Sequence, residues 1–258
     1  MSANPPAAAA DPDDTVVPPG NFNPHARAVP TGNGWTWLAD AWALFRRAAG
    51  VWIGMVLVLA VITIVAHIIP VIGWLALQIL WPVFAAGLLI ASDSVQQRGN
   101  AQFSELFAGF KHRRFGTLVV LGVIWLVLCI VIALAVGLVT GVHIAAFIGP
   151  DMTIEQVAAV AARLLIAALL ILALLVPLVM AVWFAPPLVV FHDVGAVAAM
   201  KASFAGCLHN MLPFLLYGIV WFVASILASI PFMLGWLVLA PVTAASIYTA
   251  YKDIYFNT

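Results

Sequence analysis

Three aspartates stand where long apolar segments end, and they are the charged residues of this sequence with the clearest chemical interest. Asp93, Asp193 and Asp253 each lie at the end of such a segment. A carboxylate at the C-terminal end of a helix opposes the helix dipole, at a cost of roughly 0.3–1 kcal/mol at an exposed site. We therefore expect each of these carboxylates to have a polar or cationic partner.

Basic side chains that can supply these partners lie in the shorter segments between the apolar ones. We predict a polar cluster, on the cytoplasmic side, of six residues: Asp93, Asp193, Asp253, Arg47, Arg113 and Lys201. One interpretation is structural, with ion pairs and helix caps that fasten the short segments to the helix ends. The other is functional, with the cluster forming a polar mouth where parts of the protein meet.

Metal binding and catalysis are weaker interpretations of the same residues. A site built from Asp93, Asp193, His112, His192 and His209 has no spacing that selects a metal. The sequence contains no GxSxG, HExxH, Walker or GxGxxG motif. The apolar segments also hold no Asp, Glu, Lys or Arg. We therefore predict a non-enzyme with no catalytic residue, no cofactor and no metal.

The composition indicates that lipid surrounds most of the chain. Of 258 residues, 65% are hydrophobic and only 8% are charged, whereas a soluble domain carries about 25% charged residues. Ten Lys and Arg balance ten Asp and Glu, and so few basic residues argue against nucleic acid. Cys129 and Cys207 form no CxxC pair, so we expect reduced cysteines that serve in packing.

Six segments have the length and apolarity of transmembrane helices, which need roughly 20 residues to cross the hydrocarbon core. They are residues 51–69, 71–91, 117–141, 164–187, 213–230 and 233–251. The first pair and the last pair are each separated by a short corner that contains a proline, Pro70 or Pro231. Because proline ends a helix, each pair should be a tight antiparallel hairpin.

The basic residues predict how the chain is oriented. Nine of the ten Lys and Arg residues fall on one side of the six segments, and Arg163 alone falls on the other. The side rich in Lys and Arg is the cytoplasmic side in most membrane proteins. We therefore predict a multi-pass inner-membrane protein with both termini in the cytoplasm.

The apolar segments also carry signs of an internal repeat. The corner Ile69-Pro70-Val71-Ile72-Gly73-Trp74-Leu75 is echoed, with one residue more, by Ile230-Pro231-Phe232-Met233-Leu234-Gly235-Trp236-Leu237. We predict an all-α integral membrane fold in which six transmembrane helices form three parallel repeats of an interfacial helix plus a helical hairpin. The repeats cover approximately residues 34–93, 102–193 and 196–253, within a membrane domain of residues 34–258.

The first interfacial helix shows the pattern most clearly. Its apolar face is expected to hold Trp35, Leu38, Trp42 and Phe45, and the opposite face Thr36, Asp40 and Arg47. Before it, residues 1–33 hold seven of the sixteen prolines. Since such a segment buries little apolar surface, we predict a disordered cytoplasmic tail.

Several of these motifs resemble a known but uncharacterised family of proteobacterial inner-membrane proteins. They are Gly34-Trp35-Thr36-Trp37-Leu38, the two proline corners, Phe107-Ala108-Gly109-Phe110 and Lys201-Ala202-Ser203-Phe204. More distantly, the layout is similar to the membrane domain of some glycerophosphoryl diester phosphodiesterases. The resemblance covers residues 34–258 and implies a six-span fold, but no agreed activity. The phosphodiesterase domain itself has no counterpart in this sequence.

Two functions from different classes remain after these exclusions. The first is a non-catalytic module that organises lipid or a protein partner through its interfacial helices. The second is a transporter or channel for a small solute or a lipid, with its site at the junction of the three repeats. A transporter needs a polar or water-filled path there, whereas a module of the first kind has a closed apolar centre. The expected partners are the lipid bilayer and a membrane protein or a second copy of the chain, and no nucleic acid.

Overall fold

The computed structural model describes residues 21–141 and 153–257, and helices make up most of this part of the chain. In chain order the helices are α1 (Asn33–Arg47), α2 (Ala49–Ile68), α3 (Ile72–Arg98), the 3-10 helix η1 (Phe103–Phe107), α4 (Ala108–Lys111), α5 (Phe115–Thr140), α6 (Ile154–Trp183), α7 (Ala185–His192), α8 (Ala196–His209), α9 (Met211–Ser229) and α10 (Trp236–Tyr255). Two short strands, β1 (Asn21–Phe22) and β2 (Phe256–Asn257), pair with each other.

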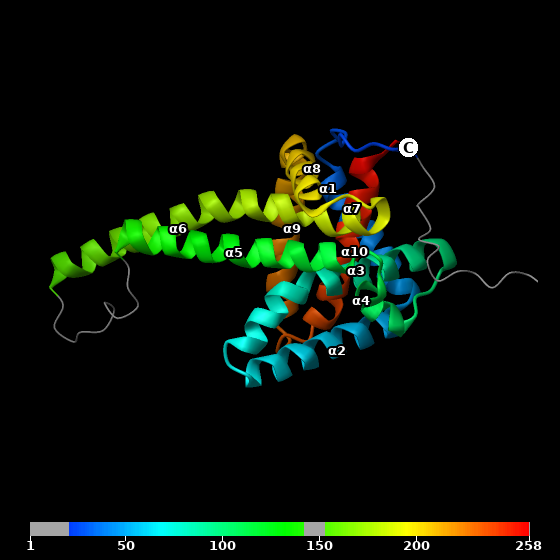
Figure 1. Ribbon diagram of the computed structural model, residues 1–258, viewed down its shortest axis with the longest axis horizontal. Helices are drawn as coiled ribbons and strands as arrows, with labels where there is room; N and C mark the ends of the chain where they lie inside the picture. The colour runs from blue at the N-terminus through cyan, green and yellow to red at the C-terminus, as the bar shows by residue number, and fades with distance from the viewer. Residues whose placement is uncertain (1–20, 142–152, 258) are drawn as a thin grey trace, which may run out of the picture.

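The long helices form three hairpins, α2 with α3, α5 with α6, and α9 with α10. The α5–α6 hairpin reaches far beyond the other helices (Figure 1). Each predicted apolar segment coincides with one long helix, except that segment 164–187 runs from α6 into α7. The second and third residues of α7 are Pro186 and Pro187. They are tolerated there because the first turn of a helix needs no backbone N–H donors.

The long helices differ in how well their length and apolarity suit a bilayer. Within the described residues, five helical stretches are long and apolar enough to cross a membrane: Ala49–Ile68, Ile72–Arg98, Phe115–Thr140, Glu155–His192 and Met211–Ser229. α10 is not among these stretches, although it has 20 residues, because Thr, Ser, Tyr, Lys and Asp side chains lower its apolarity. The six-span count and the three repeats therefore stay predictions.

Exposed apolar surface covers the ends of the hairpins that lie far from the core. Leu138 in α5 is 86% exposed, and Phe232 in the corner between α9 and α10 is 96% exposed. Exposed apolar side chains of this kind continue along α2, α5, α6 and α9. So many exposed apolar side chains are unfavourable in water, and they are the kind of surface that lipid solvates.

The two proline corners are closed by the same kind of contact. A Cβ atom added at Gly73 would strike the backbone of Ala66, and one added at Gly235 would strike Ala228. Each glycine follows its alanine by seven positions. The absence of a side chain on the glycine allows the two helices of each hairpin to approach at backbone contact.

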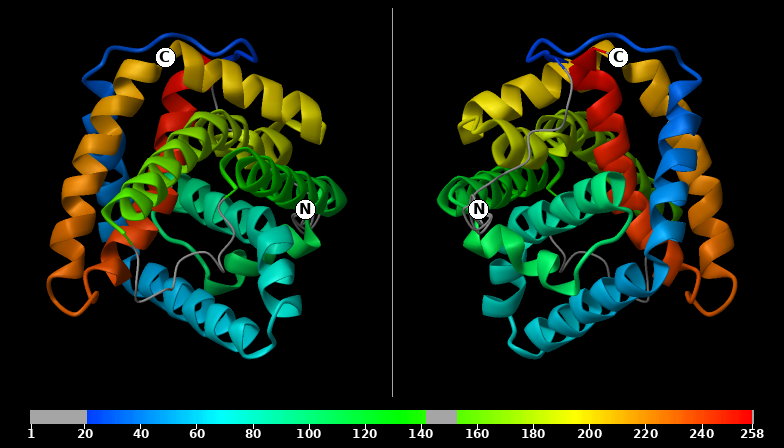
Figure 2. Two further views of the ribbon diagram at one scale, coloured as in Figure 1. Left: turned by 90° about the vertical axis from the view of Figure 1, so that its left-hand side faces the viewer. Right: turned by 90° about the vertical axis from the view of Figure 1, so that its right-hand side faces the viewer.

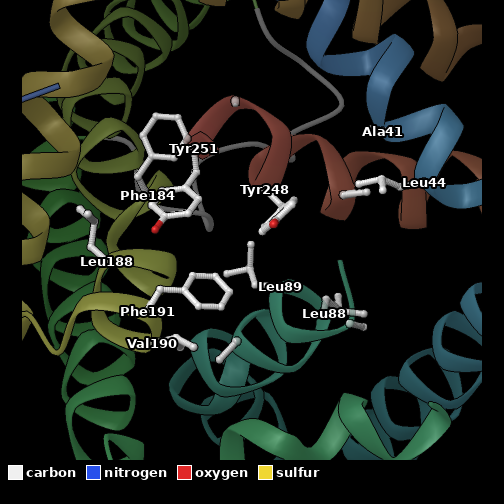
Figure 3. Close-up of a cluster of buried hydrophobic side chains, with 14 of the residues drawn as sticks. Ala41, Leu44, Leu88, Leu89, Phe184, Leu188, Val190, Phe191, Tyr248 and Tyr251 are labelled. Carbon is white, nitrogen blue, oxygen red and sulfur yellow. The ribbon is translucent and has the colours of Figure 1, made fainter. Parts of the chain in front are cut away.

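The core lies where α3 and α10 meet α7, the short helix that follows α6. Figure 3 shows Leu89 of α3, Phe191 of α7 and Tyr248 of α10 directed toward one another. All three side chains are buried, as are Tyr251 and Leu188 beside them. Aromatic and branched side chains thus fill the junction of the three hairpins. This centre is apolar apart from the hydroxyl groups of Tyr248 and Tyr251, which are hydrogen-bonded to Asp93 and His192.

The short segments pack around this core in a regular order. α1 packs on α10, η1 and α4 pack on α3, and α8 packs on α6. Figure 2 shows α1 and α8 on the outside of the bundle. η1 and α4 thus contact the second helix of the hairpin before them in the chain, and so does α8. α1 comes before all three hairpins and contacts the second helix of the last one. The second predicted interfacial helix is divided into η1 and α4 rather than continuous.

Only two of the four residues of the predicted apolar face of α1 are buried in the bundle. Leu38 and Phe45 are buried, but Trp35 and Trp42 are 57% and 44% exposed. The buried face is centred on Trp37 instead, together with Ala41 and Leu44. The helix is turned this way because Gly34 lies against the backbone of α9 at Pro213, a contact that any side chain at that position would prevent.

The predicted boundary of the disordered tail also differs from the structure. Residues 1–20 lie outside the described part of the chain, whereas residues 21–33 pack on the body of the protein. β1 pairs antiparallel with β2, so that Phe22 faces Phe256. The segment then runs across the end of the bundle beside the C-terminus (Figure 2). Its backbone and side-chain hydrogen bonds to α10 and Asn210 offset the entropy lost on ordering.

Candidate functional site

Asp253, near the end of α10, joins three segments of the chain. One carboxylate oxygen accepts a hydrogen bond from the Arg27 guanidinium at 2.9 Å. The other accepts hydrogen bonds from Asn33 Nδ2 and Trp37 Nε1, each at 2.8 Å. Arg27 also donates from Nε to the backbone oxygen of Asp253, at 2.7 Å. The carboxylate thus fastens residues 21–33 and α1 to α10.

Asp193 forms the corresponding contact at the end of α7. Its carboxylate is paired with Arg113 and Arg114, and the Arg114 Nε lies 3.0 Å from Oδ1. These arginines lie between α4 and the start of α5, so the pair links that turn to α7. The side chains are 30–49% exposed, and exposed ion pairs stabilise a fold by only about 0–1 kcal/mol.

Asp93, on the last turns of α3, is 8% exposed and has neutral partners. It accepts a hydrogen bond from the Tyr248 hydroxyl at 2.7 Å and one from Gln97 Nε2 at 2.8 Å. No Lys or Arg within the described residues lies at ion-pair distance from it. The Tyr248 contact joins α3 to α10 at the edge of the apolar centre.

The six residues of the predicted polar cluster therefore occupy different places. Asp193 and Arg113 form an ion pair, and the other two aspartates have separate partners. Lys201 is exposed on α8, and it forms no hydrogen bond or ion pair with the residues the structure describes. Arg47 lies in a groove with Asp253, so the structure brings these two to one site.

Sequence reasoning missed three of the residues that satisfy these carboxylates, namely Arg27, Trp37 and Tyr248. Arg27 was assigned to the tail because prolines surround it. A signal for Tyr248 was available, since Tyr248, Tyr251 and Tyr255 recur at helical spacing along an otherwise apolar segment. Three phenols on one helix face suggest hydrogen-bond partners on neighbouring elements.

The groove lies between α1 and α10 and reaches the end of α3. It has a volume of about 440 Å³. Its lining residues are Asn33, Thr36, Trp37, Asp40, Ala43, Leu44, Arg47, Gln96, Tyr248, Thr249, Lys252 and Asp253. Thr36, Asp40 and Arg47, the predicted polar face of α1, all lie in it. The groove thus combines two carboxylates, two cationic groups and several uncharged polar groups.

The charged groups of α1 in this groove are Asp40 and Arg47. Neither Asp40 nor Arg47 forms a hydrogen bond or an ion pair with any residue of the described chain. Partial burial, and then the nearby Asp253 carboxylate, raise the pKa of Asp40 above its ordinary value. A cation placed beside Asp40 would relieve this repulsion.

The histidines and cysteines do not gather into a ligand set within the part of the chain that the structure describes. No group of three His, Cys, Asp or Glu residues there is arranged to hold a metal ion. His192 is hydrogen-bonded to the Tyr251 hydroxyl and stacks on Phe22. Burial raises the pKa of the Cys207 thiol, in α8, to about 12, so this thiol is not reactive at neutral pH.

Comparison with known proteins gives one informative similarity. The chain is 28% identical to a probable inner membrane protein of Burkholderia thailandensis over 211 residues, which are 77% of this chain and 75% of the relative. This similarity agrees with the five apolar helices that are long enough to span a bilayer. The chain is a multi-pass membrane protein.

No protein family and no solved structure matches this membrane protein. The name of the Burkholderia relative describes a location and no activity. The resemblance to the membrane domain of glycerophosphoryl diester phosphodiesterases stays a prediction, because neither the relative nor the structure addresses it. The function is therefore inferred from the groove and the apolar centre.

Proposed function

We propose that this protein is a non-catalytic module of the inner membrane that organises lipid at the surface where its short helices lie. The observation that carries the proposal is the apolar junction of the three hairpins, filled by buried side chains such as Leu89, Phe191 and Tyr251. The polar groove lies beside this junction, between α1 and α10. Its position favours contact with lipid headgroups over passage across the bilayer.

The topology proposed for this module has six transmembrane helices, with both termini in the cytoplasm. α10 would be the sixth span, with its polar side chains satisfied by neighbouring helices. Tyr217 is hydrogen-bonded to Ser246 at 2.8 Å, and Trp221 Nε1 donates to Thr243 at 2.8 Å. Buried hydrogen bonds of this type allow polar residues inside a bilayer. The similar glycine contacts at the two proline corners support the proposed repeat.

The exposed tryptophans of α1 supply the lipid contact. Trp35 and Trp42 project from the face of α1 that is turned away from the bundle, and tryptophan is enriched where a membrane meets water. Arg46 and Arg47 at the end of the same helix would add attraction to an anionic leaflet, of about 1 kcal/mol each. This face of α1 would therefore contact the region where the membrane meets water.

A labelling experiment tests the closed centre on which the proposal depends. In a variant with Cys129 and Cys207 changed to serine, we would introduce Leu89→Cys and, as an accessible control, Lys201→Cys. A water-soluble maleimide should label the second variant and leave the first unlabelled in proteoliposomes. Rapid labelling of Leu89→Cys would reveal a water-filled path and favour the transporter alternative.

The lipid role is tested by the lipids that stay with the purified protein. Trp35→Ala and Trp42→Ala together should reduce the phospholipid retained after detergent washing, measured by mass spectrometry. Trp74→Ala, an exposed tryptophan near the proline corner of the first hairpin, is the matched control. Equal retention in the parent protein and in the double variant would contradict the proposed role of α1.

A further inference from the structure

We propose that the groove between α1 and α10 binds a phosphate ester that carries a primary ammonium group, the chemistry of phosphoethanolamine. The source would be a lipid headgroup or a small soluble ester. The lipid source rests on the proposed function, whereas the binding site itself rests on the groove. The groove holds cationic and anionic side chains in one volume of about 440 Å³, a size typical of small-molecule sites.

The cationic half of the site is formed by Arg47 and Lys252, with the Gln96 amide beside them. Arg47 forms no hydrogen bond or ion pair with other residues of the described chain. Its planar guanidinium can bind two phosphate oxygens at once. Lys252, whose Nζ lies 4.5 Å from the centre of the Phe256 ring, adds a second positive charge. These groups suit a phosphate.

The anionic half is formed by Asp40, with Asp253 close enough to repel it. The oxygens of Asp253 already accept hydrogen bonds from Arg27, Asn33 and Trp37. Asp40 has no such donor among the described residues. A primary ammonium has three N–H donors, so it can neutralise and hydrogen-bond the Asp40 carboxylate at the same time.

The spacing of the two halves fits one ligand. Asp40 and Arg47 are separated by seven residues on one helix, which is two turns and about 10 Å along the axis. The long Arg47 side chain can cover part of this separation, and the two-carbon bridge between phosphate and amine covers more. Thr36 and Thr249 line the same groove. Their hydroxyl groups already donate to the backbone oxygens of Asn33 and Trp37, so their oxygens can accept hydrogen bonds from the ammonium group.

The same arrangement predicts which related ligands are rejected. Glycerol 3-phosphate and inorganic phosphate would leave Asp40 without a cation. Phosphorylcholine carries a cation, but its quaternary ammonium has no N–H to donate to the carboxylate. A charge without a counter-charge, or a carboxylate without a donor, costs free energy in a partly buried site. Each of these ligands should therefore bind more weakly than phosphoethanolamine.

Calorimetric titration of the full-length protein in a maltoside detergent tests the proposal. The probes are O-phosphoethanolamine, phosphorylcholine, glycerol 3-phosphate and inorganic phosphate. We expect O-phosphoethanolamine to bind about tenfold more tightly than the other three. Asp40→Asn and Arg47→Gln should each weaken it by about tenfold or more. Lys201→Gln, at an exposed cation of α8 outside the groove, should leave it unchanged.

A second titration distinguishes the two sources. Dihexanoyl phosphatidylethanolamine, used as single molecules, should bind if the site takes a lipid headgroup. Binding of the free ester alone would keep the site and assign it to a soluble ligand. Two results would overturn the proposal. The first is that neither O-phosphoethanolamine nor dihexanoyl phosphatidylethanolamine gives heat of binding with protein that still melts cooperatively. The second is that inorganic phosphate and O-phosphoethanolamine bind with equal affinity.

These outcomes can be separated from failure of the proposed function. Loss of lipid retention in the Trp35→Ala and Trp42→Ala variant depends on the outer face of α1, and the groove lies on another face. If retention follows the tryptophans while neither ester binds, the lipid role stands and the groove has no phosphoethanolamine site. If the ester binds while retention does not change, the site stands and the lipid role fails.

Discussion

At the scale of single residues, the Asp253 carboxylate accepts hydrogen bonds from three residues, whereas those of Asp93 and Asp193 each accept from two. Replacing it with alanine would leave the indole N–H of Trp37 without its acceptor, in a side chain that is only 1% exposed. A buried donor left unsatisfied costs about 1–3 kcal/mol. We expect Asp253→Ala to lower the melting temperature of the protein in detergent clearly.

The control for this prediction is Asp193→Ala. Its ion pairs with Arg113 and Arg114 are partly exposed, so their loss should cost only about 0–1 kcal/mol. The expected order of melting temperatures is therefore the parent protein, then Asp193→Ala, then Asp253→Ala. A larger loss in Asp193→Ala would show that the two carboxylates have been ranked wrongly.

A second prediction at this scale concerns the glycines of the corners. Gly73→Ala would place a Cβ atom against the backbone of Ala66, and backbone cannot move aside as a flexible side chain can. Overpacking of this kind typically costs about 1–3 kcal/mol. The melting temperature should fall. Gly218→Ala in α9, where an added Cβ meets nothing within 4 Å, should not lower it.

At the scale of elements, the N-terminal segment is the part whose contribution to stability can be measured directly. Two truncations distinguish the contribution of residues 21–31 from that of residues 1–20. Removing residues 1–20 keeps the pairing of β1 with β2 and the Arg27–Asp253 ion pair, so the melting temperature should hardly change. Removing residues 1–31 deletes both contacts and should lower it.

This pair of truncations also tests how residues 21–31 contribute. Val29 N–H and the backbone oxygen of Arg27 are both hydrogen-bonded to the side chain of Asn210, which is fully buried. These bonds should be lost only in the longer truncation. Equal melting temperatures for the two truncated proteins would mean that residues 21–31 dock without contributing to the stability of the bundle.

At the scale of the whole molecule, the position of the C-terminus separates six spans from five. Reporter domains fused after Thr258 and at Gly99 should report the cytoplasm, and one at Asp151 should report the periplasm. Thr258 and Asp151 lie outside the described residues and serve here only as fusion points. With six spans, α10 returns the chain to the side on which it began.

The expectation for Thr258 rests on the asymmetry of the basic residues and on α10 crossing the membrane. The reporter at Gly99 is the internal reference, because both counts place it after two spans. A periplasmic signal at Thr258 with a cytoplasmic signal at Gly99 would show that α10 does not cross. It would then lie among the other helices as a buried, non-spanning segment.

The sequence by itself determined the helical positions in this protein. Long apolar runs and two proline corners were enough, because a bilayer requires helices of a certain length and proline ends them. It also indicated that Asp93, Asp193 and Asp253 would need partners at the helix ends. These are local rules, and they depend on neighbouring residues in the chain.

Only the tertiary structure decided which partners those carboxylates have and which face of α1 is buried. Arg27 lies 226 positions from Asp253 and Tyr248 lies 155 from Asp93, so no local pattern connects them. Trp35 and Trp42 satisfy a helical apolar stripe as well as Trp37 does. The choice between them came from the close approach of Gly34 to Pro213. That approach depends on how α1 packs against α9 and α10, and sequence periodicity carries no information about such packing.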